Sequence, residues 1–304
     1  MEKKHDYEVA IIGAGPAGIS AGIYLERAGI SPIIFEGEAP GGMLNKILKI
    51  ENYPGYTDDS GSTLAFRMYS QIEELNIELI NESVLKIEKL DDIYQIYTND
   101  KVFNVKYLIL ATGKIPRKLD VSNANKYEGK GISYCAVCDG NLYKNKDVLV
   151  VGGGNSAFLS ANYLSNIANK VYIVNRGSKL RADEKEIDSV IKKDNVEIIY
   201  NSKITNIIGK DYVEKVILND EREIPLSAIF VCIGQEVNSA YYQAINLESD
   251  NKGIIVDKNM ETSCKNVYAA GDIVSKDLYQ VVTATSEGAK AAFEIIKKHR
   301  NEAE

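Results

Sequence analysis

Residues Gly13-Ala14-Gly15-Pro16-Ala17-Gly18 form the stretch that decides the fold of this chain. They follow Tyr7–Ile12, a short apolar run with β-branched residues that predicts a strand. Apolar residues then recur at helical spacing over residues 19–28, and a second strand is expected over residues 32–35. With Glu36 after that strand, the order of strand, glycine turn, helix, strand and acid is the full fingerprint of a dinucleotide-binding fold.

The residue types in this turn suit a pyrophosphate. Gly13 and Gly15 allow a tight turn and let the backbone approach the phosphates, while the N-terminus of the following helix faces their negative charge. Glu36 is placed to accept hydrogen bonds from a ribose. We therefore expect one dinucleotide to bind at this turn.

The same pattern recurs in the middle of the chain. A strand over Asp147–Val151 precedes the turn Gly152-Gly153-Gly154-Asn155-Ser156-Ala157, in which Ala157 takes the last small position. A helix is expected over residues 158–167 and a strand over Lys170–Val174. Two nucleotide folds indicate a duplicated architecture and two different nucleotides. The expected fold class is α/β, with two Rossmann-like nucleotide-binding domains, the second inserted into the first.

A third feature near the C-terminus defines the domain boundaries. A strand ending at Gly271-Asp272 puts a carboxylate at the sheet edge where ligands bind in such folds, and a helix follows over residues 283–296. The first domain is therefore predicted to comprise residues 1–114 and 241–304, and the second residues 115–240.

A Cys-x-x-Cys pair, Cys135-Ala136-Val137-Cys138, lies just upstream of the second glycine turn and is followed by Asp139. Such a pair can close a small disulfide and reopen it, with one thiolate attacking and the other resolving. Asp139 can supply or take the proton if its surroundings favour the protonated form. The pattern indicates that electrons pass from a nucleotide carrier to a disulfide.

Other roles for this pair are less suitable. A zinc site lacks its remaining ligands, because there is no second Cys-x-x-Cys and the only histidines are His5 and His299, so no metal is predicted. A purely structural disulfide across so tight a loop would contribute little entropy. Of the remaining cysteines, Cys232 is expected to be a small buried hydrophobe in a strand, and Cys264 to lie in a polar turn without a role.

Composition excludes several classes of function. The 304 residues are 45% hydrophobic, which suffices for two modest cores, and the net charge is −7. No run rich in Lys and Arg occurs, so nucleic acid is not an expected partner, and the apolar runs are too short for a membrane span. Because residues 1–6 contain no apolar signal region, a cytoplasmic location is expected.

With these motifs the chain resembles the low-molecular-weight thioredoxin reductases from end to end. The stretches that carry the resemblance are the two glycine turns and, in addition, Gly41-Gly42, Glu51-Asn52-Tyr53-Pro54-Gly55, Ala111-Thr112-Gly113, Ser133 to Gly140 and Ala269-Ala270-Gly271-Asp272. The element Cys-Ala-x-Cys-Asp-Gly is the most specific of them. The resemblance implies a homodimeric flavoprotein that passes electrons from NADPH through FAD and the Cys135–Cys138 disulfide to thioredoxin.

The resemblance also implies roles for individual residues. Cys138 would contact the flavin in one domain orientation, Cys135 would attack thioredoxin in another, and Asp139 would handle the proton. FAD would be bound by Gly13, Gly15, Pro16, Ala17, Gly18, Glu36, Gly37, Gly41, Gly42, Asn52, Ala111, Thr112, Gly113, Gly271, Asp272, Gln280 and Val281. NADPH would be bound by Gly152, Gly154, Asn155, Ser156, Ala157, Arg176 and Arg181.

The chain departs from the family pattern at the nicotinamide site. Members that use NADPH usually carry His-Arg-Arg-x-x-x-Arg after the second strand, where this chain has Asn175, Arg176, Gly177 and finally Arg181. A Glu-Glu pair of the family is replaced by Leu159-Ser160. NADH is not clearly favoured, because Asn175 is not an acid. The alternatives are therefore NADPH, NADH or ferredoxin as the electron donor, or a dithiol oxidase that uses oxygen.

A second departure is Tyr279, where the family usually has arginine before Gln280. A tyrosine can stack or donate a hydrogen bond, but it removes a positive charge near the flavin. The expected consequence is an altered flavin potential rather than lost FAD binding.

Overall fold

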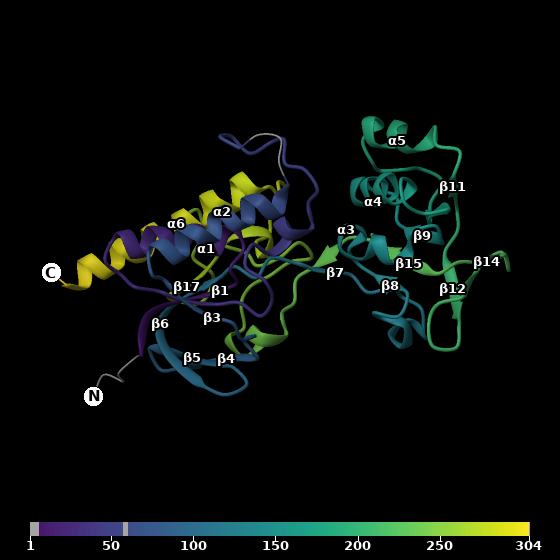
Figure 1. The fold of residues 1–304 in the computed structure, drawn as a ribbon. Coiled ribbons are helices and arrows are strands. Elements are labelled where there is room, and N and C mark those ends of the chain that lie inside the picture. The colour runs from purple at the N-terminus through teal and green to yellow at the C-terminus, as the bar shows by residue number, and fades with distance from the viewer. Residues whose placement is uncertain (1–5, 57–59, 304) are drawn as a thin grey trace. The chain divides into compact units, whose positions relative to one another are not determined.

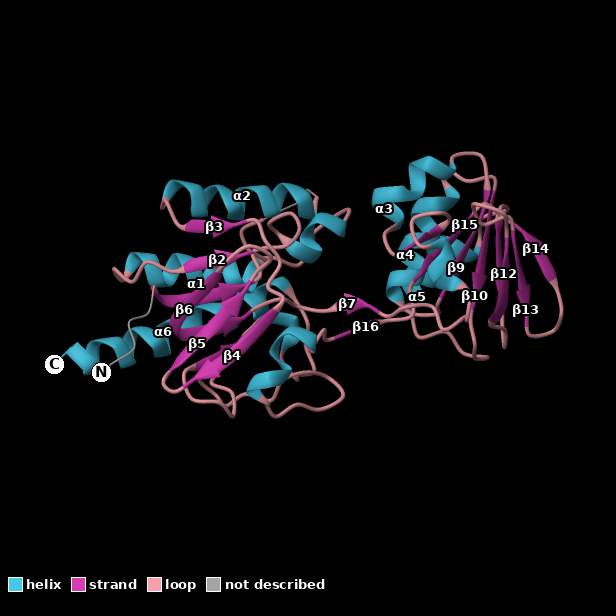
Figure 2. Ribbon diagram, turned by 90° about the horizontal axis from the view of Figure 1, so that it is seen from below, coloured by secondary structure: helices cyan, strands magenta, loops and turns pink. Residues whose placement is uncertain are grey.

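The computed structural model describes residues 6–56 and 60–303 (Figure 1). Residues 1–5, which carry most of the segment behind the expected cytoplasmic location, lie outside the described residues. The chain divides into two compact units, Met1–Ile115 with Glu236–Glu304, and Pro116–Gln235. The two crossing segments, β7 (Ile115–Pro116) and β16 (Gln235–Glu236), pair as a two-stranded ribbon (Figure 2).

The crossing points differ slightly from the expected residues 114/115 and 240/241. The return to the first unit occurs five residues earlier, because Val237 already packs against the core of that unit. The short helix η4 (Ala240–Ile245) continues this packing with its buried Tyr241 and Tyr242.

The first unit is built on a seven-stranded sheet in which β6 is central. Its C-terminal half pairs in parallel with β1 on one side and β17 on the other, while its N-terminal half pairs antiparallel with β5. Parallel pairing continues outward from β1 through β2 to β3, and β4 pairs antiparallel with β5. The strands are β1 (Tyr7–Ile12), β2 (Ile33–Phe35), β3 (Glu78–Ile80), β4 (Lys86–Leu90), β5 (Ile93–Tyr97), β6 (Val102–Leu110) and β17 (Val267–Ala269).

Alternation along these strands produces a core on each face of the sheet. Ile11 and Ile109 face the helices, whereas Ile12 and Leu110 face the β4–β5 hairpin and η4. Figure 1 shows α1 and α6 lying together along the helical face. The helices are α1 (Pro16–Arg27), α2 (Gly61–Glu74) and α6 (Val281–Ala303), with short 3₁₀ turns η1 (Gly42–Lys46) and η5 (Gly271–Ile273).

The second unit repeats this plan with an all-parallel sheet in the order β11-β10-β9-β15-β8. Val148 and Val150 pack against Phe158 of α4, and Leu149 packs against the three-stranded antiparallel sheet β12-β13-β14. The strands are β8 (Ile132–Ser133), β9 (Asp147–Val151), β10 (Lys170–Val174), β11 (Val196–Ile199), β12 (Ile204–Ile208), β13 (Lys215–Leu218), β14 (Glu223–Pro225) and β15 (Ala228–Val231). The helical elements are α3 (Ala136–Asp139), α4 (Asn155–Ser165), α5 (Glu184–Ile191), η2 (Ala124–Tyr127) and η3 (Gly140–Tyr143).

The predicted α/β class with two Rossmann-like units is confirmed, and β1, β9 and β10 have the expected bounds. The two fingerprint helices begin three residues earlier than predicted, at Pro16 and Asn155. Proline is suited to a first helical turn, where its missing N–H costs nothing. The C-terminal helix extends past residue 296, and Lys106 and Tyr107 bind Glu302 in its last turn at 2.5 and 3.2 Å. The antiparallel strands were not assigned from the sequence.

In the described part of the chain, no helix has both the length and the apolar character to span a bilayer.

Candidate functional site: two glycine turns and a redox disulfide

The first glycine turn lies where β1, β6 and β17 end. Gly13 donates its N–H to the Phe35 carbonyl at 2.8 Å, and Ala111 donates to Ile12 at 2.8 Å. Ala270 in turn donates to the Leu110 carbonyl at 2.9 Å. The segments predicted to bind FAD around Gly13, Ala111 and Gly271 therefore meet at the carboxyl edge of one sheet, where ligands bind in open α/β folds.

The glycines of this turn serve different purposes. Gly13 has a φ of +106°, and a Cβ there would lie 2.6 Å from the Ala111 carbonyl oxygen, so the fold itself requires glycine. A Cβ on Gly15 would meet nothing within 4 Å. Because no side chain caps α1 at Gly15, the first-turn N–H groups face this open space. The turn has the room and the donors to hold a pyrophosphate.

Glu36 ties the second strand to the same turn. Its carboxylate accepts hydrogen bonds from the Ala14 N–H at 2.7 Å and from the Glu38 N–H at 2.9 Å. The structure therefore places Glu36 beside the glycine turn, with both oxygens already engaged by backbone donors. Ribose binding by Glu36 remains a prediction.

Further residues of the predicted FAD site also contact one another. The Asn52 amide donates to Gln280 Oε1 at 2.9 Å, and the Gly41 N–H donates to the Ala14 carbonyl at 2.7 Å. Asp272 follows β17, and burial raises the pKa of its carboxyl while the charges of Lys276 and Lys114 act in the opposite direction. Segments far apart in sequence thus converge on one edge.

Two buried oxygens in the loops of the first unit lack a hydrogen-bond partner in the described residues, Glu82 Oε2 and the Tyr279 hydroxyl. Buried polar atoms are rarely left unpaired, so a polar ligand would satisfy such atoms. Tyr279 directly precedes Gln280, which accepts the hydrogen bond of Asn52, so its hydroxyl and the open space at Gly15 fit a dinucleotide such as FAD.

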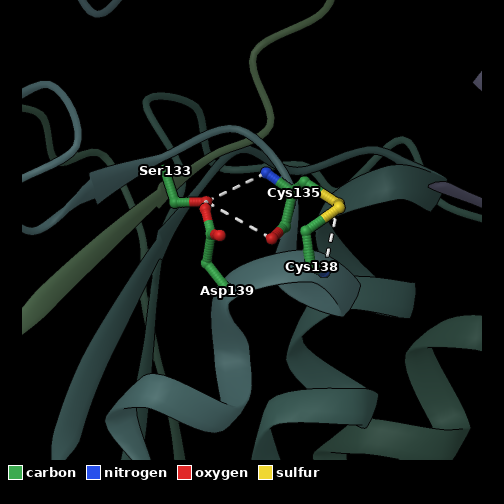
Figure 3. The surroundings of a disulfide bond; sticks show 4 residues. All are labelled: Ser133, Cys135, Cys138 and Asp139. Carbon is green, nitrogen blue, oxygen red and sulfur yellow. Dashed lines mark hydrogen bonds between the residues drawn. A yellow bond between two sulfur atoms is a disulfide. The ribbon is translucent and has the colours of Figure 1, made fainter. Parts of the chain in front are cut away.

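The second unit carries the disulfide. Cys135 and Cys138 are joined, at the start of the short helix α3 (Figure 3). The Cys138 N–H donates to Cys135 Sγ at 3.2 Å, a contact that would also stabilise negative charge on that sulfur after reduction. Cys138 is exposed and Cys135 half-buried in this unit. The predicted redox pair is therefore formed and accessible.

Asp139 is fixed beside the disulfide by Ser133. The Ser133 hydroxyl donates to Asp139 Oδ2 at 2.6 Å and also accepts the Cys135 N–H at 3.1 Å (Figure 3). Ser133 is buried at the end of β8, which pairs with β15. Ser133 has no predicted role of its own, and its position two residues before Cys135 is the only signal of this contact in the sequence.

The other two cysteines are free. Burial raises the pKa of the Cys232 thiol, which lies 3.5 Å from the Ser160 hydroxyl. Cys264 Sγ lies 3.3 Å from the Tyr94 hydroxyl. Among the residues that the structure describes, no group of three or more His, Cys, Asp and Glu side chains is arranged to hold a metal ion.

The second glycine turn repeats the design of the first. Gly152 has a φ of +144°, and a Cβ there would run into the Cys232 carbonyl. Gly154 again faces open space at the uncapped start of α4, and Ser156 is exposed in the first helical turn. The Asn155 side chain exchanges hydrogen bonds with Asp183, at 2.7 Å to its N–H and 2.8 Å to its carboxylate.

The loop after β10 folds against this turn. The buried Asn175 amide donates to the carbonyls of Gly177 and Lys179 at 2.9 and 3.1 Å, so it shapes the loop from within. The Arg181 N–H donates to the Gly153 carbonyl at 2.7 Å. Arg176, Lys179 and Arg181 are exposed, and none has a carboxylate partner in the described residues. Cations without a carboxylate partner in the loop after β10 are suited to attract an anion.

Two nucleotide-binding folds together with a Cys-x-x-Cys disulfide are the features of a flavin-dependent disulfide oxidoreductase. The chain belongs to the pyridine nucleotide-disulphide oxidoreductase family, which it matches over residues 7–288. It is 40% identical over 296 residues to a thioredoxin reductase of Mycoplasma pneumoniae, covering 95% of this chain and 94% of the relative.

Solved structures agree with this assignment. The crystal structure of Lactococcus lactis thioredoxin reductase has a TM-score of 0.89 and 35% identity, covering 96% of this chain and 98% of its own. A ferredoxin-flavin thioredoxin reductase from Clostridium acetobutylicum has a TM-score of 0.55 and 31% identity, covering 97% of this chain and 98% of its own.

Substitutions at the two open glycines, Gly15 and Gly154, should affect the binding of different nucleotides. Both Gly15 and Gly154 have extended backbone that valine tolerates, so Gly15→Val and Gly154→Val should fold. Gly15→Val should weaken FAD binding about 100-fold, because the side chain displaces phosphate contacts that contribute about 1.5–3 kcal/mol each. Gly154→Val should retain FAD and lose affinity for the nicotinamide nucleotide. Flavin absorbance per protein and nucleotide titration measure the two effects, and equal FAD loss in both variants would contradict the assignment.

Proposed function

We propose that the protein is an FAD-dependent thioredoxin-disulfide reductase that uses NADPH. FAD would bind at the turn of residues 13–18 and NADPH at the turn of residues 152–157. The observation that carries the proposal is the Cys135–Cys138 disulfide, because it lies in the same unit as the second glycine turn, with Asp139 and Ser133 bound beside it. The relatives named thioredoxin reductase support thioredoxin as the substrate.

The chemistry of the chain's own residues follows from thiol–disulfide exchange. FAD, when bound, supplies the electron pair that reduces the disulfide to two thiols. The Cys135 thiolate attacks one sulfur of the thioredoxin disulfide, forming a mixed disulfide and releasing the other thioredoxin sulfur as a thiolate. The Cys138 thiolate then attacks the Cys135 sulfur of the mixed disulfide. The Cys135–Cys138 disulfide forms again, and the second thioredoxin sulfur leaves as a thiolate. Asp139 can pass protons to or from these sulfurs.

An anaerobic titration tests the proposal directly. NADPH is added to the purified FAD-loaded protein while flavin absorbance is followed, and thioredoxin reduction is then measured with catalytic amounts of protein. We expect near-stoichiometric bleaching by NADPH and turnover with thioredoxin. NADPH should still bleach the flavin of Cys135→Ser and of Cys138→Ser, because the flavin site is left intact. Neither variant should reduce thioredoxin, because each lacks one of the two thiols that disulfide exchange requires. Turnover that persists in either variant would exclude disulfide exchange through this pair.

Asp139→Asn is expected to lower thioredoxin turnover about 100-fold or more, the scale of a lost general acid–base. Asparagine can still accept the hydrogen bond from Ser133, so the variant removes proton transfer and preserves the contact. Initial rates and their pH profile are the measurement. Asp220→Asn, in an exposed turn of the same unit, is the matched control. An Asp139→Asn enzyme with the rate and profile of the wild type would rule out the assigned role.

Arg176→Gln and Arg181→Gln should each raise the KM for NADPH about ten- to a hundredfold, because each removes a charge-assisted contact with the 2′-phosphate. The KM for NADH, which lacks that phosphate, should not change. Lys210→Gln, an exposed cation elsewhere in the unit, serves as the control. Parallel changes in both KM values would show that these arginines do not distinguish the two nucleotides.

A second candidate keeps the flavin and disulfide chemistry but takes electrons from ferredoxin. It is favoured by Asn175, whose amide is used within the loop, and by Gly177, which offers no cation to a phosphate. The similar protein from Clostridium acetobutylicum is named a ferredoxin-flavin thioredoxin reductase. Failure of NADPH and NADH to bleach a flavin that dithionite still reduces would favour this candidate.

A homodimer in the cytoplasm completes the proposal. Support for the dimer comes from the family resemblance and from the exposed aromatic side chains Tyr24 on α1 and Phe293 on α6. Sedimentation analysis of the FAD-loaded protein would measure the oligomeric state.

A further inference from the structure

Tyr279, the residue that replaces a family arginine, carries a lysine on its ring. Lys114 Nζ lies 3.8 Å from the ring centroid, and Lys276 Nζ lies 5.5 Å from it. Cations are attracted to the face of an aromatic ring, so the tyrosine is a platform that holds Lys114. The position that lost a charged side chain has therefore acquired a charge from another segment.

The two lysines differ in what else they contact. Lys276 Nζ forms an ion pair with Glu287 at 2.6 Å, and Glu287 also accepts the Gly271 N–H at 2.9 Å. Lys114 is half-buried and has no carboxylate partner among the described residues. Lys276 is thus held in an ion pair, whereas Lys114 is held by the tyrosine ring and acts on the Asp272 carboxyl through its charge alone.

Lys114 also lies in the loops that form the predicted FAD site. It directly follows the segment of residues 111–113 at the end of β6, and Tyr279 directly precedes Gln280, which accepts the hydrogen bond of Asn52. The charge of Lys114 acts on the carboxyl of Asp272 at the end of β17. The Tyr279 hydroxyl is buried and has no hydrogen-bond partner among the described residues, so it can bind a polar ligand at this place.

We propose that Lys114, held over the ring of Tyr279, sets the reduction potential of the bound flavin by supplying the positive charge that arginine at position 279 would supply. The proposal rests on the FAD site of the proposed function. A reduced flavin is stabilised by a nearby cation, because reduction adds negative charge to the ring system. In this role Lys114 acts on the flavin through its charge and Tyr279 is the positioning residue that holds it, so the sequence departure at Tyr279 relocates a charge rather than removing it.

The test is a redox titration of the FAD-loaded protein. Lys114→Gln should shift the two-electron midpoint potential to more negative values, by about tenfold in the equilibrium constant, which corresponds to about 30 mV. Lys114→Arg should restore the wild-type potential. Tyr279→Phe keeps the ring that holds Lys114 and should shift the potential less than Tyr279→Leu, which removes the ring and should shift it in the same direction as Lys114→Gln.

Two further variants make the result specific. The double variant Lys114→Gln with Tyr279→Arg returns a cation to position 279 and should recover the potential. Lys86→Gln removes a different lysine that lies over a tyrosine, 5.7 Å from the ring of Tyr97 on the hairpin of the first unit, and should have no effect. FAD dissociation constants for every variant separate a change of potential from a change of binding.

An unchanged potential in Lys114→Gln overturns the inference, as does an equal shift in Lys86→Gln. Weaker FAD binding at unchanged potential would also overturn it, because Lys114 would then be a binding residue only. These outcomes leave the proposed function standing. A wild-type protein that binds no FAD overturns the proposed function and the inference together.

Discussion

The close approach of a glycine to a neighbouring strand is the constraint on which the rest of this structure depends. Gly13 passes against the Ala111 carbonyl, and Gly152 passes against the Cys232 carbonyl. In each case a Cβ would force the turn away from the sheet, and the following helix could not begin with its N–H groups at the sheet edge. Because the constraint is met twice, one chain contains two units of the same plan, each with an open glycine, Gly15 or Gly154, at the uncapped start of a helix.

The redox pair depends on the second of these units for its geometry. β8 pairs with β15, and this pairing buries Ser133 at the strand end just before Cys135. From there Ser133 reaches both the Cys135 backbone and the Asp139 carboxylate. A tight four-residue motif therefore gains a fixed acid beside the disulfide through one buried hydroxyl. Thiol–disulfide exchange requires an accessible sulfur, and this arrangement leaves Cys138 exposed with a carboxylate held close by.

Much of the site could be predicted from the sequence because its parts are local. The glycine turns, the Cys-x-x-Cys pair and the strands β1, β9 and β10 are each set by a few consecutive residues. The rest depended on contacts between distant segments. From the sequence, Asn175 showed only that a cation or an acid is absent from this position. In the structure its amide donates hydrogen bonds to two carbonyls of the following loop and so shapes that loop. Tyr279 was expected to remove a charge, and Lys114, far away in sequence, lies on its ring.

By itself, the sequence determined the class of fold, the presence of two dinucleotide turns and the identity of the redox cysteines, since glycine spacing and cysteine spacing act within a single turn of chain. Only the tertiary structure decided which polar groups are already engaged and which charges are free for a ligand. Glu36 is occupied by the N–H groups of Ala14 and Glu38, while Lys276 is neutralised by Glu287. Such pairings join residues from different strands and loops, and their partners are chosen by packing in three dimensions rather than by spacing along the chain.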